Sequence, residues 1–280
     1  MSLDIGAAIT EGVERLRGRD GLVLVGAFVV VGVLSSVAGQ SLLVELAEAS
    51  LEVAQSPDAP PGTDVEALRD QVRQVRANAP LAVDVSPGAA FGLAFLLGIL
   101  AEALRIVAIR VFYTARGERP DGLGRNLPFA TVNGFLGGIV VYALTALGLV
   151  FLVVPGVFLA LALFFVRQEI AIEDRNFVDA MAESWTLTKG SRLNLFGLVL
   201  ILAVLFGVNQ LLPAAVAGSI GVDVAGTVVG AVVSPVVTVF GIAATTRAYA
   251  QLKGADSTGV DETDEPEAVG ALGPDDLPEP

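Results

Sequence analysis

Residues 126–166 read NLPFATVNGFLGGIVVYALTALGLVFLVVPGVFLALALFFV and contain no charged side chain over 41 positions. As a single helix this stretch would be about 60 Å long, roughly twice the hydrocarbon thickness of a bilayer. The strongest break within it is Pro155-Gly156, a dipeptide that marks turns. We therefore interpret the stretch as two membrane crossings joined by a tight turn.

Three further charge-free stretches, Gly21–Val44, Leu193–Val222 and Val224–Thr246, extend this interpretation to the rest of the chain. The chain is 54% hydrophobic with a mean hydropathy of +0.70, well outside the usage of soluble domains. The sequence predicts an all-α polytopic membrane protein with six transmembrane helices. They are Gly21–Gly39, Gly88–Tyr113, Val132–Val153, Gly156–Ile172, Leu195–Leu212 and Val224–Tyr249.

The composition also excludes several kinds of chemistry. The chain has no Cys and no His, which removes disulfides, thiolate sites, His-ligated zinc and Ser-His-Asp catalysis. An intramembrane hydrolase would need a nucleophile and a base, and no pair of Asp residues lies in any predicted crossing. We therefore predict no catalytic, cofactor-binding or metal-binding residues, and no enzymatic activity.

Charge is distributed unevenly along the chain. Net charge is −13, and residues 255–280 contribute nine acidic side chains and no basic one. This segment has the composition of a disordered, solvating tail, so the predicted membrane domain covers residues 1–254. No basic patch remains that would favour nucleic acid. Acidity, 15 Arg against 2 Lys and the lack of Cys indicate a halophilic archaeon or, alternatively, a GC-rich genome.

Basic residues are concentrated on one side of the predicted membrane, which sets the orientation. Twelve lie on that side: Arg15, Arg17, Arg19, Arg116, Arg119, Arg125, Arg167, Arg175, Lys189, Arg192, Arg247 and Lys253. The other side has three, all in one long loop: Arg69, Arg73 and Arg76. Both termini are therefore predicted to be cytoplasmic in a cell-membrane protein. A cleaved signal peptide at the basic N-terminus, ending near Gly39, stays open as an alternative.

The long external loop, residues 40–87, has its own pattern. The segment from Ser56 to Gly62 breaks the chain with three prolines, and aliphatic residues follow at helical spacing at positions 65, 68, 72 and 75. We predict an external helical hairpin, which is either a spacer that packs on itself or a cap that docks a partner.

A second amphipathic segment, residues 176–190, lies on the cytoplasmic side. Asn176 is a predicted N-cap and Gly190 a predicted left-handed stop. Trp suits the boundary between membrane and water. The segment is thus predicted to be an interfacial helix on the inner leaflet. Its predicted anchor residues are Phe177, Met181, Trp185 and Lys189.

Part of this region resembles a known family. The residues that carry the resemblance are Val154-Pro155-Gly156-Val157, Arg167, the segment from Ala180 through Glu183-Ser184-Trp185-Thr186-Leu187-Thr188-Lys189-Gly190, and Leu195-Phe196-Gly197-Leu198. The pattern resembles uncharacterised haloarchaeal multi-pass membrane proteins. More distantly it is similar to the membrane domain that some bacteria fuse to glycerophosphodiester phosphodiesterases. The resemblance implies a membrane fold but no activity, since the phosphodiesterase chemistry needs His.

Ionisable residues inside the predicted crossings are the candidates for function. Glu102 lies near the middle of the second crossing, and Arg105 follows three residues later on the same face. Such residues usually pair or line a wet cavity, because each costs about 3 kcal/mol to insert. Glu102, Arg105, Arg110 and Arg167 therefore form a candidate intramembrane site. The alternatives are a structural ion pair that locks helix packing and snorkelling of the arginines to the interface.

Two functional hypotheses follow. The first is a non-enzymatic membrane scaffold, envelope factor or accessory factor that contacts the lipid bilayer and another membrane or cytoplasmic protein. The second is a transporter or channel for a small solute, ion or lipid that uses Glu102 and Arg105. Substitution of both residues by Gln separates the two hypotheses.

Overall fold

The computed structural model describes residues 3–114, 122–220 and 223–261. Every regular element that it contains in these ranges is an α-helix. In chain order they are α1 (Ile5–Arg17), α2 (Arg19–Gln55), α3 (Val65–Ala77), α4 (Pro87–Tyr113), α5 (Leu127–Phe151), α6 (Val153–Ala162), α7 (Val166–Glu173), α8 (Phe177–Leu187), α9 (Arg192–Ile220) and α10 (Asp223–Asp261).

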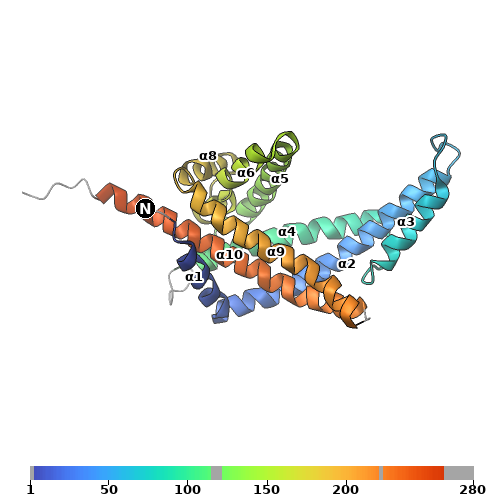
Figure 1. Cartoon of the computed structure of the whole chain (residues 1–280), viewed down its shortest axis with the longest axis horizontal. Helices are drawn as coiled ribbons and strands as arrows, with labels where there is room; N and C mark the ends of the chain where they lie inside the picture. The colour runs from blue at the N-terminus through green and yellow to red at the C-terminus, as the bar shows by residue number, and fades with distance from the viewer. Residues whose placement is uncertain (1–2, 115–121, 221–222, 262–280) are drawn as a thin grey trace, which may run out of the picture.

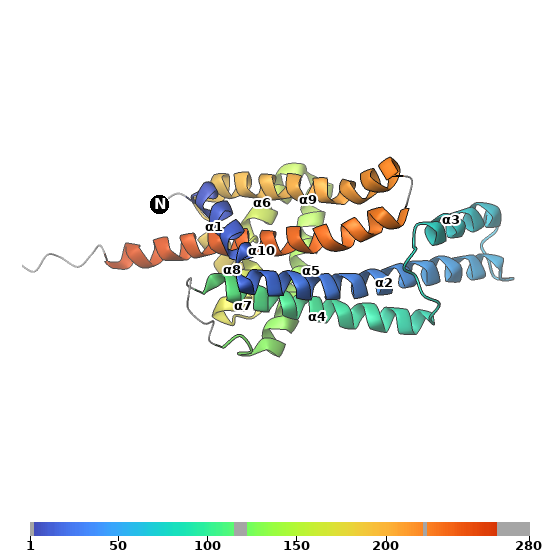
Figure 2. The same ribbon diagram turned by 90° about the horizontal axis from the view of Figure 1, so that it is seen from below.

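Four long helices form the body of the molecule: α2 packs on α4, α9 packs on α10, and α10 joins the two pairs. They run along a common long axis (Figures 1 and 2). Within the described residues, six helical segments are long and apolar enough to cross a membrane, as the sequence predicts. The chain is therefore a multi-pass α-helical membrane protein.

The α5–α6 hairpin is oriented differently from these four helices. In both views it lies across the long axis and contacts the bundle on one side (Figures 1 and 2). Its tip, from Val150 to Val154, is exposed. This crosswise placement brings α7, which follows α6, against α4.

The connection between α5 and α6 differs from the predicted Pro155-Gly156 turn. The chain breaks at Leu152, whose φ of −158° and ψ of 139° are extended, and Pro155 lies in the first turn of α6. Proline is tolerated there because the N–H groups of a first helical turn have no partner within the helix. Gly156 instead serves close packing: a Cβ on it would lie 2.6 Å from the backbone N of Leu149 in α5.

The fourth predicted crossing is interrupted. Residues 163–165 leave the α-helical ladder between α6 and α7, and Ser184 of α8 compensates for the break. The Ser184 hydroxyl accepts a hydrogen bond from the Phe165 N–H at 3.1 Å and donates one to the Ala162 carbonyl at 2.9 Å. Ser184 is fully buried, so it satisfies two backbone groups that water cannot reach.

The external loop contains a long antiparallel arrangement. α2 continues for 37 residues, and α3 folds back along it (Figure 2). The side chains of Val65, Leu68, Val72 and Val75 are all half-buried. Leu81 and Val83, in the segment that leads into α4, donate backbone hydrogen bonds to side chains of α2. These hydrogen bonds fix the segment after α3 to α2 at the base of the hairpin.

Two short helices lie at the opposite end, with the C-terminal part of α10 (Figure 2). α1 packs on α10 at Gly12, where a Cβ would lie 3.0 Å from the Ala244 backbone. α8 begins at the predicted N-cap Asn176, whose side chain accepts from two backbone N–H groups. Gly190 has a φ of +92°, the left-handed conformation predicted from the sequence.

The last two crossings are longer than predicted. α9 continues through Pro213 to Ile220, and α10 continues through Pro235 to Asp261. Residues 255–261 of the predicted acidic tail are therefore helical in the structure, and residues 262–280 lie outside the described part of the chain. Arg116 and Arg119, which the orientation argument uses, also lie outside it.

Candidate functional site

Three of the four candidate intramembrane residues meet in one cluster. Glu102 of α4 accepts a hydrogen bond from Arg105 Nη1 at 2.9 Å and another from Arg167 Nε at 3.0 Å. Glu102 is 5% exposed. The side chains of Arg105 and Arg167 are 32% and 38% exposed. The cluster is thus a buried carboxylate with a half-exposed guanidinium on either side.

Two glycines of α5 make room for the cluster. A Cβ on Gly134 would lie 2.8 Å from Glu102 Oε1, and a Cβ on Gly138 would lie 2.4 Å from Arg167 Nη2. Gly134 and Gly138 are four residues apart, a small-xxx-small pattern that commonly serves the packing of one helix on another. In the structure the pattern instead receives polar side chains from α4 and α7. Without it the crosswise α5 could not lie so close to the ion pairs.

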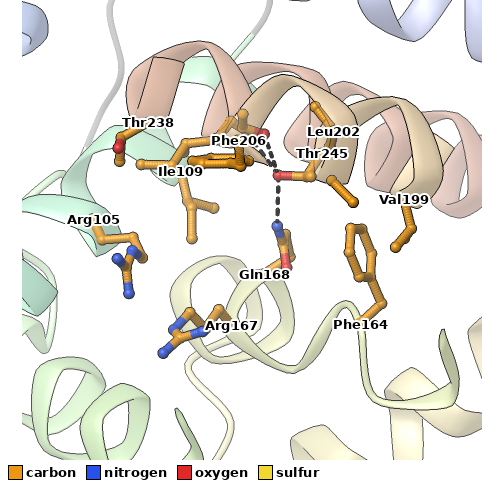
Figure 3. Close-up of a pocket in the computed structure, with 13 residues that line it drawn as sticks. Arg105, Ile109, Phe164, Arg167, Gln168, Val199, Leu202, Phe206, Thr238 and Thr245 are labelled. Carbon is orange, nitrogen blue, oxygen red and sulfur yellow. Dashed lines mark hydrogen bonds between the residues drawn. The ribbon is translucent and has the colours of Figure 1, made fainter. Parts of the chain in front are cut away.

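The two arginines border a cavity of about 420 Å³ between α4, α7, α9 and α10. Their guanidinium groups lie on the same side of this cavity (Figure 3). Apolar residues make up most of the other walls: Ile109, Phe164, Val199, Leu202, Ala203, Phe206, Gly241 and Ile242. Positive charge and an apolar wall therefore face the same space.

Gln168 adds a polar group to this cavity. It follows Arg167 in α7, and its Nε2 donates to Thr245 Oγ1 of α10 at 3.3 Å (Figure 3). The side chain is buried, and its Oε1 has no hydrogen-bond partner in the described part of the chain. Buried polar atoms are normally satisfied, so an unpaired one beside a cavity indicates a place for water or ligand.

Arg110, the fourth candidate, lies elsewhere and has another role. Its guanidinium donates to the carbonyls of Ala171 at 2.7 Å, Leu123 at 2.8 Å and Arg125 at 2.7 Å. It also pairs with Asp174 at 2.9 Å. Arg110 therefore fastens α4 to the end of α7 and to the segment before α5, and it does not reach the cavity.

A second polar network, which sequence reasoning misses, joins α7, α8 and α10. Glu169 is fully buried and accepts from Tyr249 Oη at 3.0 Å. Lys253 Nζ lies 3.2 Å from Glu169 and 3.9 Å from Glu183, and Arg175 Nε lies 3.3 Å from Glu169. The sequence does show Glu169 as an ionisable residue near the end of the fourth predicted crossing, two residues after Arg167. Its partners come from distant segments.

The predicted anchor residues of α8 divide between two environments. Trp185 and Lys189 are exposed, whereas Phe177 and Met181 pack against the hydrophobic core. Arg192 stacks on Trp185 and on Phe158 of α6, with its Cζ 4.9 Å and 4.5 Å from the two ring centroids. The four residues therefore do not share one exposed face, because α8 is seated on α5, α6 and α7.

The polar groups at the cavity have the chemistry of an anion-binding site. One carboxylate and two guanidinium groups give the cavity cluster a formal charge of +1. Among the described residues, no group of three or more His, Cys, Asp or Glu residues could hold a metal ion. The two guanidinium groups suit an anion, because each offers several N–H groups to oxygen acceptors.

Comparison with known proteins places the chain in one family, whose function is unknown. The family model for the domain of unknown function DUF7847 matches residues 3–252. No curated protein and no solved structure matches the chain. Because the match covers nearly all of the helical region, the chain belongs to the DUF7847 family.

Proposed function

We propose that this membrane protein binds the anionic head group of an amphiphile in the cavity between α4, α7, α9 and α10. The observation that carries the proposal is the ratio of two arginines to one carboxylate at the cavity wall. A structural ion pair needs one cation for one anion, so the cluster retains one positive charge for a ligand. An unpaired charge in a membrane interior is costly, and an anion would offset it.

The hydrogen-bonding capacity of the two arginines supports this proposal. A guanidinium has five N–H donors. Within the described part of the chain, Arg105 and Arg167 each donate one hydrogen bond, and Glu102 accepts both. Their remaining N–H groups are free for phosphate or carboxylate oxygens. The unpaired Oε1 of Gln168 can accept from a ligand hydroxyl or a water.

The apolar walls indicate why the ligand is an amphiphile rather than a small polar anion. Ligand sites combine a few placed polar groups with a predominantly apolar lining. Here the two guanidinium groups lie on one side of the cavity, and the aromatic rings of Phe164 and Phe206 line other parts of it (Figure 3). A head group at the arginines would leave an acyl chain against these walls.

The interruption between α6 and α7 also favours a binding role. Discontinuous transmembrane helices commonly form ligand sites near the bilayer midplane. Here the break at residues 163–165 directly precedes Arg167 and Gln168, the two residues that α7 contributes to the cavity. An uninterrupted helix would place these residues on a different face.

The proposal also covers the membrane location, the orientation and the origin of the protein. We infer a cell-membrane protein that acts by binding rather than by catalysis, with both termini cytoplasmic. Arg15 and Arg17 lie in α1 and Lys189 follows α8, and these two helices lie at the same end of the molecule (Figure 2). This concentration of basic residues supports the orientation. The acidic composition and the family resemblance support a haloarchaeal origin and kinship with the phosphodiesterase-linked membrane domain.

The test is lipid binding to the purified protein, measured by native mass spectrometry in mild detergent. The probes are dioleoyl phosphatidylglycerol, which is anionic, and dioleoyl phosphatidylcholine, which has the same chains and no net charge. We expect the wild type to retain more phosphatidylglycerol. The double variant Arg105→Gln/Arg167→Gln should lose this preference, and Glu102→Gln should strengthen it, because it raises the cluster charge from +1 to +2.

Arg73→Gln is the matched control, since it removes one arginine from the exposed face of α3. Competition by inorganic phosphate separates a head-group site from a site for free anions. If the double variant folds and keeps the lipid preference and all cellular function, the anion site does not exist. The three residues would then be a packing element of a membrane scaffold, which is the first hypothesis from the sequence.

A further inference from the structure

A second cavity, also of about 420 Å³, lies on the hairpin side of the first. Residues of α2, α4, α9 and α10 line it, together with Leu81 from the segment between α3 and α4. Arg105 and Thr238 line both cavities, so the two spaces meet at these side chains. The second cavity therefore ends at one of the two arginines of the anion site.

The lining of this second cavity is polar for a space inside a membrane protein. Hydroxyl and amide side chains contribute to it from two sides: Ser35, Ser36, Gln40, Thr227 and Ser234. The first cavity has a mainly apolar lining by comparison. Hydroxyl and amide groups favour water as a filling over acyl chains, because they offer it hydrogen-bond partners. A volume of this size has room for roughly ten water molecules.

We propose that this second cavity is a water-filled vestibule through which an anion reaches Arg105 from the side of the membrane that bears the α2–α3 hairpin. The positive charge at its inner end raises the local concentration of anions along the route. Gln40 lies at the other end, where its Oε1 accepts from the Leu81 N–H at 2.8 Å beside the base of the hairpin. This contact fixes the segment that borders the opening.

The inference deepens the proposed function, on which only its charge preference depends. Water in the vestibule is a separate property, and it can be measured without any lipid-binding assay. An aqueous route to one side gives the head group a path along polar groups while its chain stays in lipid. The anion site would then exchange ligand with the aqueous phase as well as with the bilayer.

The chain has no Cys, which permits a direct test by single-cysteine labelling. Ser36→Cys and Thr238→Cys place a thiol in the vestibule and at its inner end. Leu34→Cys is the matched control, since Leu34 is exposed on the same helix two residues from Ser36 and does not line the cavity. Thr63→Cys, at the tip of the hairpin, reports which face of a sealed vesicle is outside.

The reagents are two membrane-impermeant methanethiosulfonates, one with an anionic sulfonate and one with a cationic trimethylammonium group. We expect both vestibule thiols to react from the face on which Thr63→Cys reacts, and Leu34→Cys to stay unmodified. Relative to Thr63→Cys, the vestibule thiols should favour the anionic reagent roughly tenfold. Adding Arg105→Gln should abolish this preference while leaving the thiols reactive.

Two results would overturn the inference. If Ser36→Cys is as inert as Leu34→Cys, the space holds lipid or is closed. If it reacts only from the opposite face, the route runs to the other side of the membrane. A reactive vestibule in a protein that shows no preference for phosphatidylglycerol would retain the aqueous route and refute the proposed lipid site instead.

Discussion

The same substitution at two arginines of α4, five residues apart, should have very different costs. Arg110→Gln removes a guanidinium that makes four hydrogen bonds, three to backbone carbonyls and one to Asp174. Arg105→Gln removes one that makes a single hydrogen bond to Glu102 within the described residues. Comparison of the two variants therefore distinguishes an arginine with a structural role from one whose N–H groups remain available to a ligand.

The magnitudes follow from these contacts. Breaking a buried charged pair and leaving its partners unsatisfied typically costs about 3–5 kcal/mol, so we expect Arg110→Gln to destabilise by that amount. Arg105 is one-third exposed, and Glu102 would keep its hydrogen bond to Arg167. Arg105→Gln should therefore cost about 1 kcal/mol. The difference, at least about 2 kcal/mol, is roughly 30-fold in the unfolding equilibrium.

Unfolding by sodium dodecyl sulfate in mixed micelles provides the measurement. Trp185 is the sole tryptophan of the chain, and its ring packs 5.3 Å from that of Phe158, so its fluorescence reports separation of α8 from α6. Equal costs for the two variants, or a larger cost for Arg105→Gln, would refute the assignment of Arg105 to a ligand site. The folded variants should also differ in lipid binding, with phosphatidylglycerol preference lost only in Arg105→Gln.

Three further outcomes are expected. Gly138→Ala should displace the Arg167 guanidinium and lower phosphatidylglycerol retention, because its Cβ would lie 2.4 Å from Arg167 Nη2; Gly207→Ala, where no atom lies within 4 Å, is the control that should leave retention unchanged. Ser184→Ala should destabilise by about 1–3 kcal/mol in the same unfolding assay, because two buried backbone groups lose their partner; a cost near zero would mean that α6 and α7 need no support from α8. Cysteines at Thr63 and Thr186 should be labelled from opposite faces of the membrane, and labelling from one face would contradict the orientation.

Much of the architecture follows from local patterns. The sequence predicts the second crossing as Gly88–Tyr113, and α4 spans Pro87–Tyr113, because a long apolar run bounded by a Ser cap leaves few alternatives. The Glu102–Arg105 contact follows from helical geometry, since residues three apart lie on one face. Pairing of Glu102 with Arg167 requires in addition that α4 and α7 are neighbours, as they are in the structure.

Other features depend on contacts between distant segments and leave no local signal. The interruption between α6 and α7 has neither Pro nor Gly at residues 163–165, and it exists because Ser184, about twenty residues later, supplies the missing partners. The partners of Arg110 are mostly backbone carbonyls, which carry no side-chain identity. Pro155 marks a helix start rather than the turn, because the extended residue Leu152 takes that role.

The hydrogen bonds of Ser184 couple the docking of α8 to the geometry of the cavity. Its hydroxyl stabilises the helix break only while α8 is docked, and the break positions Arg167 and Gln168 at the cavity. Docking of α8 and occupancy of the cavity are therefore thermodynamically linked, and linkage of two binding equilibria is reciprocal. A protein that displaced α8 would weaken ligand binding, and a bound ligand would resist that displacement by the same free energy.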